Sequence, residues 1–180
     1  LVGGCAYNTE TAENAMNREL FEKTHIKNVN FEMFDVFTNP NRSPLKRMIA
    51  ISFIGVLDIE KAEILSKTNK TSDIGWFDIK NIPELAYDHN EIVNYALEEL
   101  KNKIVTTDIL KSLFPKEFTL PELHNVYTSI LNIEIDRRNF RKKMINLNLI
   151  SDTNKTVGYK GKKPAKLYRF NEIIKNQSIF

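Results

Sequence analysis

The sequence contains only one cysteine, Cys5, and three histidines that lie far apart. A single cysteine excludes an internal disulfide bond and a cysteine-based zinc cluster, and it is typical of proteins in a reducing compartment. The histidines lack the close spacing of a zinc motif. Long apolar runs are also missing, since none approaches the roughly 18 residues that indicate a transmembrane helix. We therefore expect a cytoplasmic protein that does not enter a membrane.

The first residues, from Leu1 to Cys5, do not resemble a signal peptide, because they contain no charged segment and no long apolar core. They include no initiator methionine and resemble the end of a β-strand. We expect the sequence to begin inside a domain whose earlier strands are absent from it.

Charge is distributed unevenly along the sequence. Its 180 residues, of which 27% are charged and 42% hydrophobic, are typical of one large or two small globular domains. Residues 137–169 contain eleven Lys or Arg and one acidic residue, so they carry +10 and leave −7 for the rest of a chain whose total is +3. This asymmetry predicts two domains, the second of which binds an anion. Nucleic acid is favoured over a membrane surface, because this segment has no tryptophan and no lipidation signal.

Hydrophobic periodicity predicts both helices and strands in the first half of the sequence. An amphipathic helix is expected from Thr9 or Thr11 to Thr24. Residues 48–57, MIAISFIGVL, are apolar and short, which predicts a buried strand. The other expected elements are strands at residues 31–38 and 76–79 and helices at residues 59–65 and 88–103.

The second half of the sequence predicts a winged helix-turn-helix. Thr119 and Glu122 have the spacing of a capping box, which begins a helix at residues 121–131. A helix capped by Asp136 and ending near Asn148 follows, and in this geometry it enters the major groove of DNA. The remaining elements are a short helix at residues 108–114, a strand at 149–150, a polar loop at 151–164 whose residues 159–164 form the wing, and a strand at 165–170.

The helix after Asp136 combines an apolar stripe with a cationic face. Phe140, Met144 and Leu147 lie at positions i, i+4 and i+7, so they share one side of the helix. Arginine can donate two hydrogen bonds at once to a phosphate or a guanine edge. An alternative interpretation is a basic face that only keeps the module soluble. The residues predicted to contact DNA are Arg137, Arg138, Asn139, Arg141 and Lys142 in the helix and Lys160, Lys162 and Lys163 in the wing.

A second motif, near the start of the chain, resembles the Nudix box, G-x5-E-x7-R-E-U-x-E-E-x-G-U, where U is aliphatic. In Nudix enzymes the carboxylates of this motif hold a divalent metal ion on a diphosphate. The alternative interpretation is a solvated acidic helix face. The residues that match the pattern are Gly4, Glu10, Arg18, Glu19, Leu20, Glu22 and Ile26.

Two positions of the motif depart from the Nudix pattern. Lys23 replaces the second glutamate of the E-E pair, and His25 replaces the glycine. Lys23 changes the local charge by two units and is expected to pair with Glu19 four residues earlier. Glu19 and Glu22 are therefore only weak candidates for metal ligands. We expect no catalytic residue and no cofactor, and Mg²⁺ is required only if the chain is an active hydrolase.

Further segments resemble the NrtR family of Nudix-related transcriptional regulators, including its sugar-responsive branch. Asn39–Arg47 resembles the family segment D-P-x-R-D-P-x-x-R, and Leu85–His89 resembles L-x-F-D-H. In the second half, Phe118–Leu123 resembles F-T-L-x-x-L, Asp136–Lys142 resembles D-x-R-N-F-R-[KR], and Gly161–Phe170 resembles G-[RK]-x-A-x-L-Y-[RK]-F with one extra residue. The resemblance covers essentially the whole chain.

This resemblance implies an α+β protein in which a truncated Nudix-like α/β/α sandwich precedes a C-terminal winged helix-turn-helix. The expected parts are a Nudix-like sensing domain at residues 1–87, an interdomain helix at 88–105 and a DNA-binding domain at 106–180. It also implies a homodimeric repressor that leaves its double-stranded DNA operator when ADP-ribose or a pentose binds. The alternative function is an active Nudix hydrolase of nucleoside diphosphate derivatives with an accessory winged helix domain.

Three residues are candidates for contact with the effector. Arg42 and Arg47 lie in a turn before a core strand and suit phosphate or hydroxyl groups. Trp76 suits stacking on an adenine or a sugar face. The alternative interpretations are a surface position for each arginine and a core position for the tryptophan.

Overall fold

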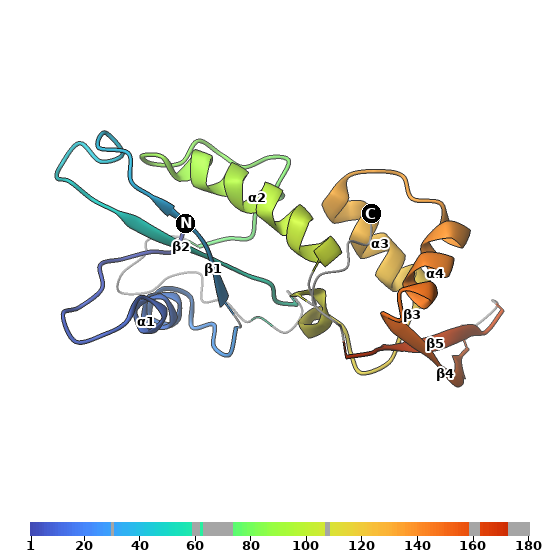
Figure 1. Cartoon of the computed structure of the whole chain (residues 1–180). Helices are drawn as coiled ribbons and strands as arrows, with labels where there is room; N and C mark the ends of the chain where they lie inside the picture. Colours follow the sequence, from blue (N-terminus) through green and yellow to red (C-terminus); the bar gives the residue numbers. More distant parts are fainter. Residues whose placement is uncertain (30, 59–61, 63–73, 107–108, 159–162, 173–180) are drawn as a thin grey trace. The chain divides into compact units, whose positions relative to one another are not determined.

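The computed structural model describes residues 1–29, 31–58, 62, 74–106, 109–158 and 163–172 (Figure 1). The chain divides into two compact units, Leu1–Leu97 and Glu98–Phe180. The division falls within α2, a helix that spans His89–Thr106. None of the described helices is long and apolar enough to cross a membrane.

In the first unit, α1 spans Ala12–Thr24 and is capped at both ends. The backbone N–H of Asn14 donates to the hydroxyl oxygen of Thr11 at 3.2 Å, which satisfies one free donor of the first turn. At the other end His25 has a φ of 63°, and its N–H donates to the carbonyl of Phe21 at 2.8 Å. The predicted helix is thus confirmed, and His25 ends it in the left-handed conformation that glycine usually takes.

The sheet of the first unit pairs β1 (Phe31–Phe37) with β2 (Ala50–Gly55) in antiparallel register, with an irregularity between Met33 and Asp35. Figure 1 draws this ribbon between α1 and the first turns of α2. The ring of Phe37 packs edge-on against Tyr95 of α2, with ring centroids 5.6 Å apart. Strands are confirmed at both predicted positions, but β2 is not buried as expected: its residues are half-buried or exposed, and Ile51 is 46% exposed.

The strand predicted at Trp76–Ile79 is wrong. Residues 74–78 have no regular structure, and a turn follows in which the N–H of Asn81 donates to the carbonyl of Asp78 at 2.9 Å. Aromatic and β-branched residues favour strands only where a neighbouring strand pairs with them, and no described strand lies against this segment. The helix predicted at residues 59–65 lies outside the described residues, apart from Ala62.

The second unit packs helices against a three-stranded antiparallel sheet. The strand order is β3-β5-β4, so the last strand in sequence is central. This is the element order and topology of a winged helix-turn-helix. The elements are η2, a 3₁₀ helix at Ile109–Leu113, then β3 (Phe118–Thr119), α3 (Leu120–Leu131), α4 (Arg137–Asn146), β4 (Ile150–Val157) and β5 (Ala165–Phe170).

Two details of the second unit correct the sequence-based expectations. The expected loop at residues 151–164 is shorter, because β4 continues to Val157 and pairs with β5. Cross-strand contacts stabilise this polar strand, among them an ion pair of 2.6 Å between Asp152 and Lys166. The short helix expected at residues 108–114 is the 3₁₀ helix η2, and residues 107–108 lie outside the described part of the chain.

A capping box joins the sheet of the second unit to its core helix. The backbone N–H of Glu122 donates to the hydroxyl oxygen of Thr119, and the carboxylate of Glu122 accepts from the Thr119 N–H at 2.7 Å, as predicted. The core beneath brings together side chains from α2, β3, α3 and α4. The largest fully buried members are Phe118, Phe140, Ile104, Leu123 and Met144.

Candidate nucleic-acid interface and sensor site

Asp136 is the N-cap residue of α4 and determines where this helix begins. One carboxylate oxygen of Asp136 accepts a hydrogen bond of 2.8 Å from the backbone N–H of Asn139. Removal of such a cap typically costs about 1 kcal/mol, because the first-turn donor then lacks its partner. The N-cap predicted from the sequence is therefore confirmed, and it fixes where the cationic helix begins.

Replacing Asp136 by alanine is expected to lower the free energy of unfolding by about 1 kcal/mol. Urea denaturation followed by far-UV circular dichroism measures this change. Asp136→Ser is the matched control, because its hydroxyl oxygen can still accept the Asn139 N–H, and it should stay close to the wild type. An equal loss in both variants would contradict a capping role for the side chain.

The buried side of α4 holds the helix on the core. Phe140 and Met144 are 2% and 0% exposed, and Leu147, the C-cap residue after α4, is half-buried against the same core, so the predicted apolar stripe is confirmed. The Phe140 ring packs against the rings of Tyr127 and His124, each with a centroid separation of 5.3 Å. Because this side is fixed, the opposite side of α4 is presented to solvent in one orientation.

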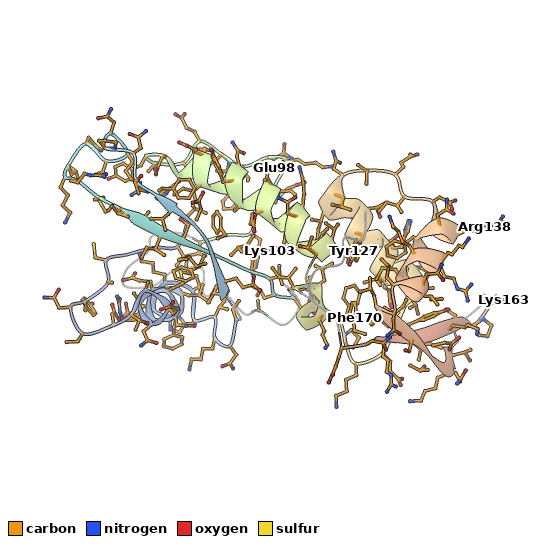
Figure 2. The ribbon with its side chains drawn as sticks, viewed as in Figure 1. Glu98, Lys103, Tyr127, Arg138, Lys163 and Phe170 are labelled. Carbon is orange, nitrogen blue, oxygen red and sulfur yellow. The ribbon has the colours of Figure 1, made fainter. Side chains whose placement is uncertain are left out.

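We call that opposite side the cationic face: the exposed Arg137, Arg138, Arg141, Lys142 and Lys143 of α4, which contains no acidic residue. Figure 2 shows Arg138 extending outward from the helix. Within the described part of the chain, the side chains of Arg137, Arg138 and Lys142 form no ion pair. Their charge is thus not neutralised locally, which suits binding to phosphates or base edges.

Arg141 differs from its neighbours because it contacts the sheet. Its Nε–H donates to the hydroxyl of Tyr168 in β5 at 3.4 Å, and this hydrogen bond raises the pKa of the Arg141 guanidinium. The buried Tyr168 side chain thereby restricts where the guanidinium can lie. Asn139 is exposed next to the Asp136 cap.

Of the three wing lysines predicted to contact DNA, the structure describes one, Lys163. Lys163 is exposed and labelled in Figure 2, whereas Lys160 and Lys162 lie outside the described residues. Lys166 pairs with Asp152 at 2.6 Å, and the hydrogen bond from Lys166 lowers the pKa of that carboxyl. Lys155 pairs with Glu117 at 2.7 Å. These two lysines are therefore partly neutralised, whereas Lys163 forms no ion pair with a described residue.

His124 supports α4, a role that its sequence context did not predict. Its side chain is 8% exposed, and Nε2 lies 2.7 Å from the carbonyl oxygen of Ile135, the residue before the Asp136 cap. The hydrogen bond ties α3 to the turn that leads into α4. The spacing in the sequence could have indicated this buried position. His124 lies three residues before the buried Tyr127, so both side chains share the apolar side of α3.

In the first unit, the residues of the Nudix box converge on the Arg18 guanidinium. Arg18 lies 2.6 Å from Glu10, 2.6 Å from Glu19 and 3.3 Å from Glu22. It also donates to the carbonyl of Cys5 at 3.1 Å. The hydrogen bond from Arg18 lowers the pKa of the Glu10 carboxyl. The three carboxylates are thus held together by a cation that belongs to the protein.

Glu19 is the buried carboxylate of this group. Burial raises the pKa of the Glu19 carboxyl, but hydrogen bonds from Arg18 and Lys23 outweigh burial and leave the pKa below its usual value. The predicted pair between Lys23 and Glu19 is confirmed at 3.0 Å. A Cβ added at Gly4 would lie 2.2 Å from the Glu19 carboxyl carbon, so a larger residue there would displace this carboxylate.

The carboxylates do not fit the divalent metal ion that a Nudix box implies. Both Glu19 oxygens are engaged, one by Arg18 at 2.6 Å and the other by Lys23 at 3.0 Å. Among the described residues, no group of three or more His, Cys, Asp or Glu is arranged to hold a metal ion. The positive charges of Arg18 and Lys23 also repel a metal cation. Each unit charge about 4 Å from the ion costs roughly 4 kcal/mol at an effective dielectric constant of ~20.

The three candidate effector residues lie in different surroundings. Arg42 forms a two-fold hydrogen-bonded pair with Asp88, at 2.8 and 2.9 Å, and its side chain is only 7% exposed. Arg47 is exposed and donates to the carbonyls of Thr38 and Met48 at 2.8 and 3.2 Å. Trp76 is 47% exposed. Arg47 and Trp76 are therefore accessible to solvent, while the Arg42 guanidinium is occupied by Asp88.

Sequence comparison relates both units to known proteins. Residues 111–170 match the model of the NrtR DNA-binding winged helix domain. Over 156 residues, the chain is 30% identical to the ADPR responsive transcriptional repressor NtrR of Acinetobacter baylyi, covering 86% of this chain and 61% of that protein. Over 93 residues, it is 34% identical to the ADP-ribose pyrophosphatase of Methanocaldococcus jannaschii, covering 52% of this chain and 53% of that enzyme. The chain thus spans less than two thirds of either relative.

Solved structures match most of the chain. Shewanella oneidensis NrtR complexed with a 27mer DNA matches 91% of this chain and 74% of its own, with a TM-score of 0.71 and 25% identity. A MutT/nudix family protein from Enterococcus faecalis matches 93% of this chain and 71% of its own with a TM-score of 0.75, and its 21% identity indicates likeness of fold alone. The predicted α+β fold, a Nudix-like part followed by a winged helix, is confirmed.

Proposed function

We propose that this chain, which resembles the NrtR regulators in both of its units, is a DNA-binding transcriptional repressor whose Nudix-like unit senses ADP-ribose. The family resemblance predicted from the motifs is confirmed by the winged helix model and by the Acinetobacter relative. The observation that carries the proposal is the cationic face of α4, which has no acidic neighbour in the helix and is held in one orientation by the buried Phe140 and Met144.

The proposed interface places α4 in the major groove of double-stranded DNA. Arg137, Arg138 and Asn139 lie in the first turn of α4, the part of a recognition helix that contacts base edges. Arg141 and Lys142 extend the face along the helix toward the phosphates. Lys163, with Lys160 and Lys162, supplies backbone contacts from the wing. Two copies in a homodimer would present two such helices to half-sites about one helical turn apart.

The proposed sensor uses the Nudix-like unit for binding rather than hydrolysis. Arg47 and Trp76 suit the phosphates and the adenine of ADP-ribose, because both side chains are exposed. Arg42 supports this unit through Asp88, which precedes α2, the helix that continues into the second unit. An effector that binds one arrangement of the dimer more tightly shifts the population toward it, and DNA is released if that arrangement does not fit the operator.

The alternative function, hydrolysis of a nucleoside diphosphate derivative, is favoured by the likeness to an ADP-ribose pyrophosphatase. The geometry of the Nudix box argues against it. A metal-assisted reaction needs carboxylate oxygens that are free to coordinate the ion, and in Glu19 both are engaged by Arg18 and Lys23. No catalytic step is therefore assigned to Glu10, Glu19 or Glu22.

The proposal predicts salt-dependent binding to a duplex taken from upstream of the chain's own coding region. Fluorescence anisotropy at several salt concentrations should give a steep negative slope of log affinity against log salt concentration, because several phosphate contacts release counterions. ADP-ribose should weaken this binding, and a pentose is the second effector to test. A scrambled duplex and a single-stranded RNA of equal length are the controls.

Two outcomes would contradict the proposal. A flat salt slope would exclude α4 and the wing as the DNA interface. Turnover of ADP-ribose with Mg²⁺ or Mn²⁺ at about 1 s⁻¹ or faster, the low end for typical enzymes, would instead support the hydrolase.

A further inference from the structure

Lys23 makes contacts that reach beyond its own helix. Its ammonium lies 3.0 Å from the carboxylate of Glu19 and also donates to the backbone carbonyl of Gly3, which is twenty residues earlier in the sequence. An exposed ion pair between residues four apart on a helix adds little to the stability of a protein. Here the Lys23 and Glu19 side chains are only 21% and 10% exposed, so both are largely removed from water.

The position of Lys23 resembles that of a bound cation more than that of a surface lysine. It neutralises one oxygen of Glu19 while Arg18 neutralises the other at 2.6 Å. Gly4 lies close against the same Glu19 carboxylate, so the Gly3–Gly4 loop covers one side of these ion pairs. A carboxylate oxygen, a backbone carbonyl and a nearby group of acidic side chains are the ligand types that a hard divalent cation takes.

We propose that Lys23 is a built-in cation that occupies the place of a divalent metal ion and fastens the Gly3–Gly4 loop to α1. The first unit therefore keeps the shape of its Nudix box without Mg²⁺ or Mn²⁺. The ammonium supplies the positive charge, the Gly3 carbonyl and Glu19 accept its hydrogen bonds, and Arg18 completes the neutralisation. This inference concerns the first unit alone and does not depend on DNA binding.

The test measures Mn²⁺ binding to the full chain by electron paramagnetic resonance of free Mn²⁺. Lys23→Glu removes the built-in cation and adds a carboxylate, so it should bind Mn²⁺ roughly tenfold or more tightly than the wild type. Lys27→Glu is the matched control, because it makes the same change of charge three residues beyond the end of α1, where Lys27 lies over the ring of Phe21 at 4.3 Å. It should leave Mn²⁺ affinity close to that of the wild type.

Thermal unfolding provides a second measurement. The melting temperature of the wild type should be the same in EDTA and in Mn²⁺, whereas Lys23→Glu should melt lower in EDTA and recover when Mn²⁺ is added. Lys23→Met keeps the length of the side chain and covers the case in which the glutamate variant does not fold. It should melt below the wild type and bind Mn²⁺ more tightly than the wild type, because the Glu19 oxygen that Lys23 engages is then freed.

Three results would overturn the proposal. One is an equal Mn²⁺ affinity in the wild type and Lys23→Glu, or in the wild type and Lys23→Met where only that variant folds. Another is a gain in Lys27→Glu as large as in Lys23→Glu, which would reflect overall charge rather than position. The third is a wild-type melting temperature that falls in EDTA, which would mean that a metal ion already holds the box together.

Discussion

Replacing Arg137 and Arg138 together by alanine is expected to raise the Kd for operator DNA roughly a hundredfold. Each arginine that contacts a base edge is worth about 1–3 kcal/mol, and each lost phosphate contact reduces the salt slope by about 1. The two side chains are exposed and form no ion pair with any described residue, so their removal should leave the fold intact. Fluorescence anisotropy at several salt concentrations measures both the affinity and the slope.

Lys111→Ala is the control for this variant. It removes a cation from an exposed position in the same unit, but Lys111 belongs to η2 rather than to α4 or the wing. Its DNA affinity should stay within about twofold of the wild type. If Lys111→Ala weakened binding as much as the double variant, the interface would be a diffuse charge effect and α4 would not be the recognition helix. Unchanged melting temperatures in both variants ensure that binding alone is compared.

Replacing Phe140 by alanine is expected to lower the free energy of unfolding of the second unit by about 3–5 kcal/mol. The side chain is 2% exposed and packs against the rings of Tyr127 and His124, so its removal leaves a cavity lined by aromatic groups. Such a loss is a large part of the stability of a small domain. Urea denaturation followed by far-UV circular dichroism measures it. DNA binding should be lost as well, because α4 loses the side that orients its cationic face.

Ile145→Ala provides the comparison on the same helix. Ile145 is 39% exposed, and its truncation should cost less than about 1 kcal/mol because little buried area is lost. A similar cost for both variants would contradict the assignment of Phe140 as the residue that fixes α4. Loss of DNA binding in Ile145→Ala without loss of stability would instead place Ile145 in the DNA interface.

Periodicity and local chemistry predicted most of the second unit correctly. The capping box at Thr119, the Asp136 cap and the stripe of Phe140 and Met144 depend on residues at most a few positions apart, so they are readable along the chain. The length of β4 was not readable in this way, since its polar residues form a strand only through pairing with β5. The same reason explains Trp76–Ile79, where strand-forming residues have no described partner strand.

The sequence alone predicted the fold, a Nudix-like part followed by a winged helix, because the spacing of Gly4, Glu10, Arg18 and Glu19 and the basic helix after Asp136 are local patterns of charge and shape. Which charges are available depends on the tertiary structure. It showed Arg42 occupied by Asp88, Lys166 by Asp152, and Glu19 by both Arg18 and Lys23, while Arg137, Arg138 and Lys142 form no ion pair among the described residues. The reason is that a salt bridge depends on separations of a few ångströms between side chains that can be far apart in sequence, as Arg42 and Asp88 are.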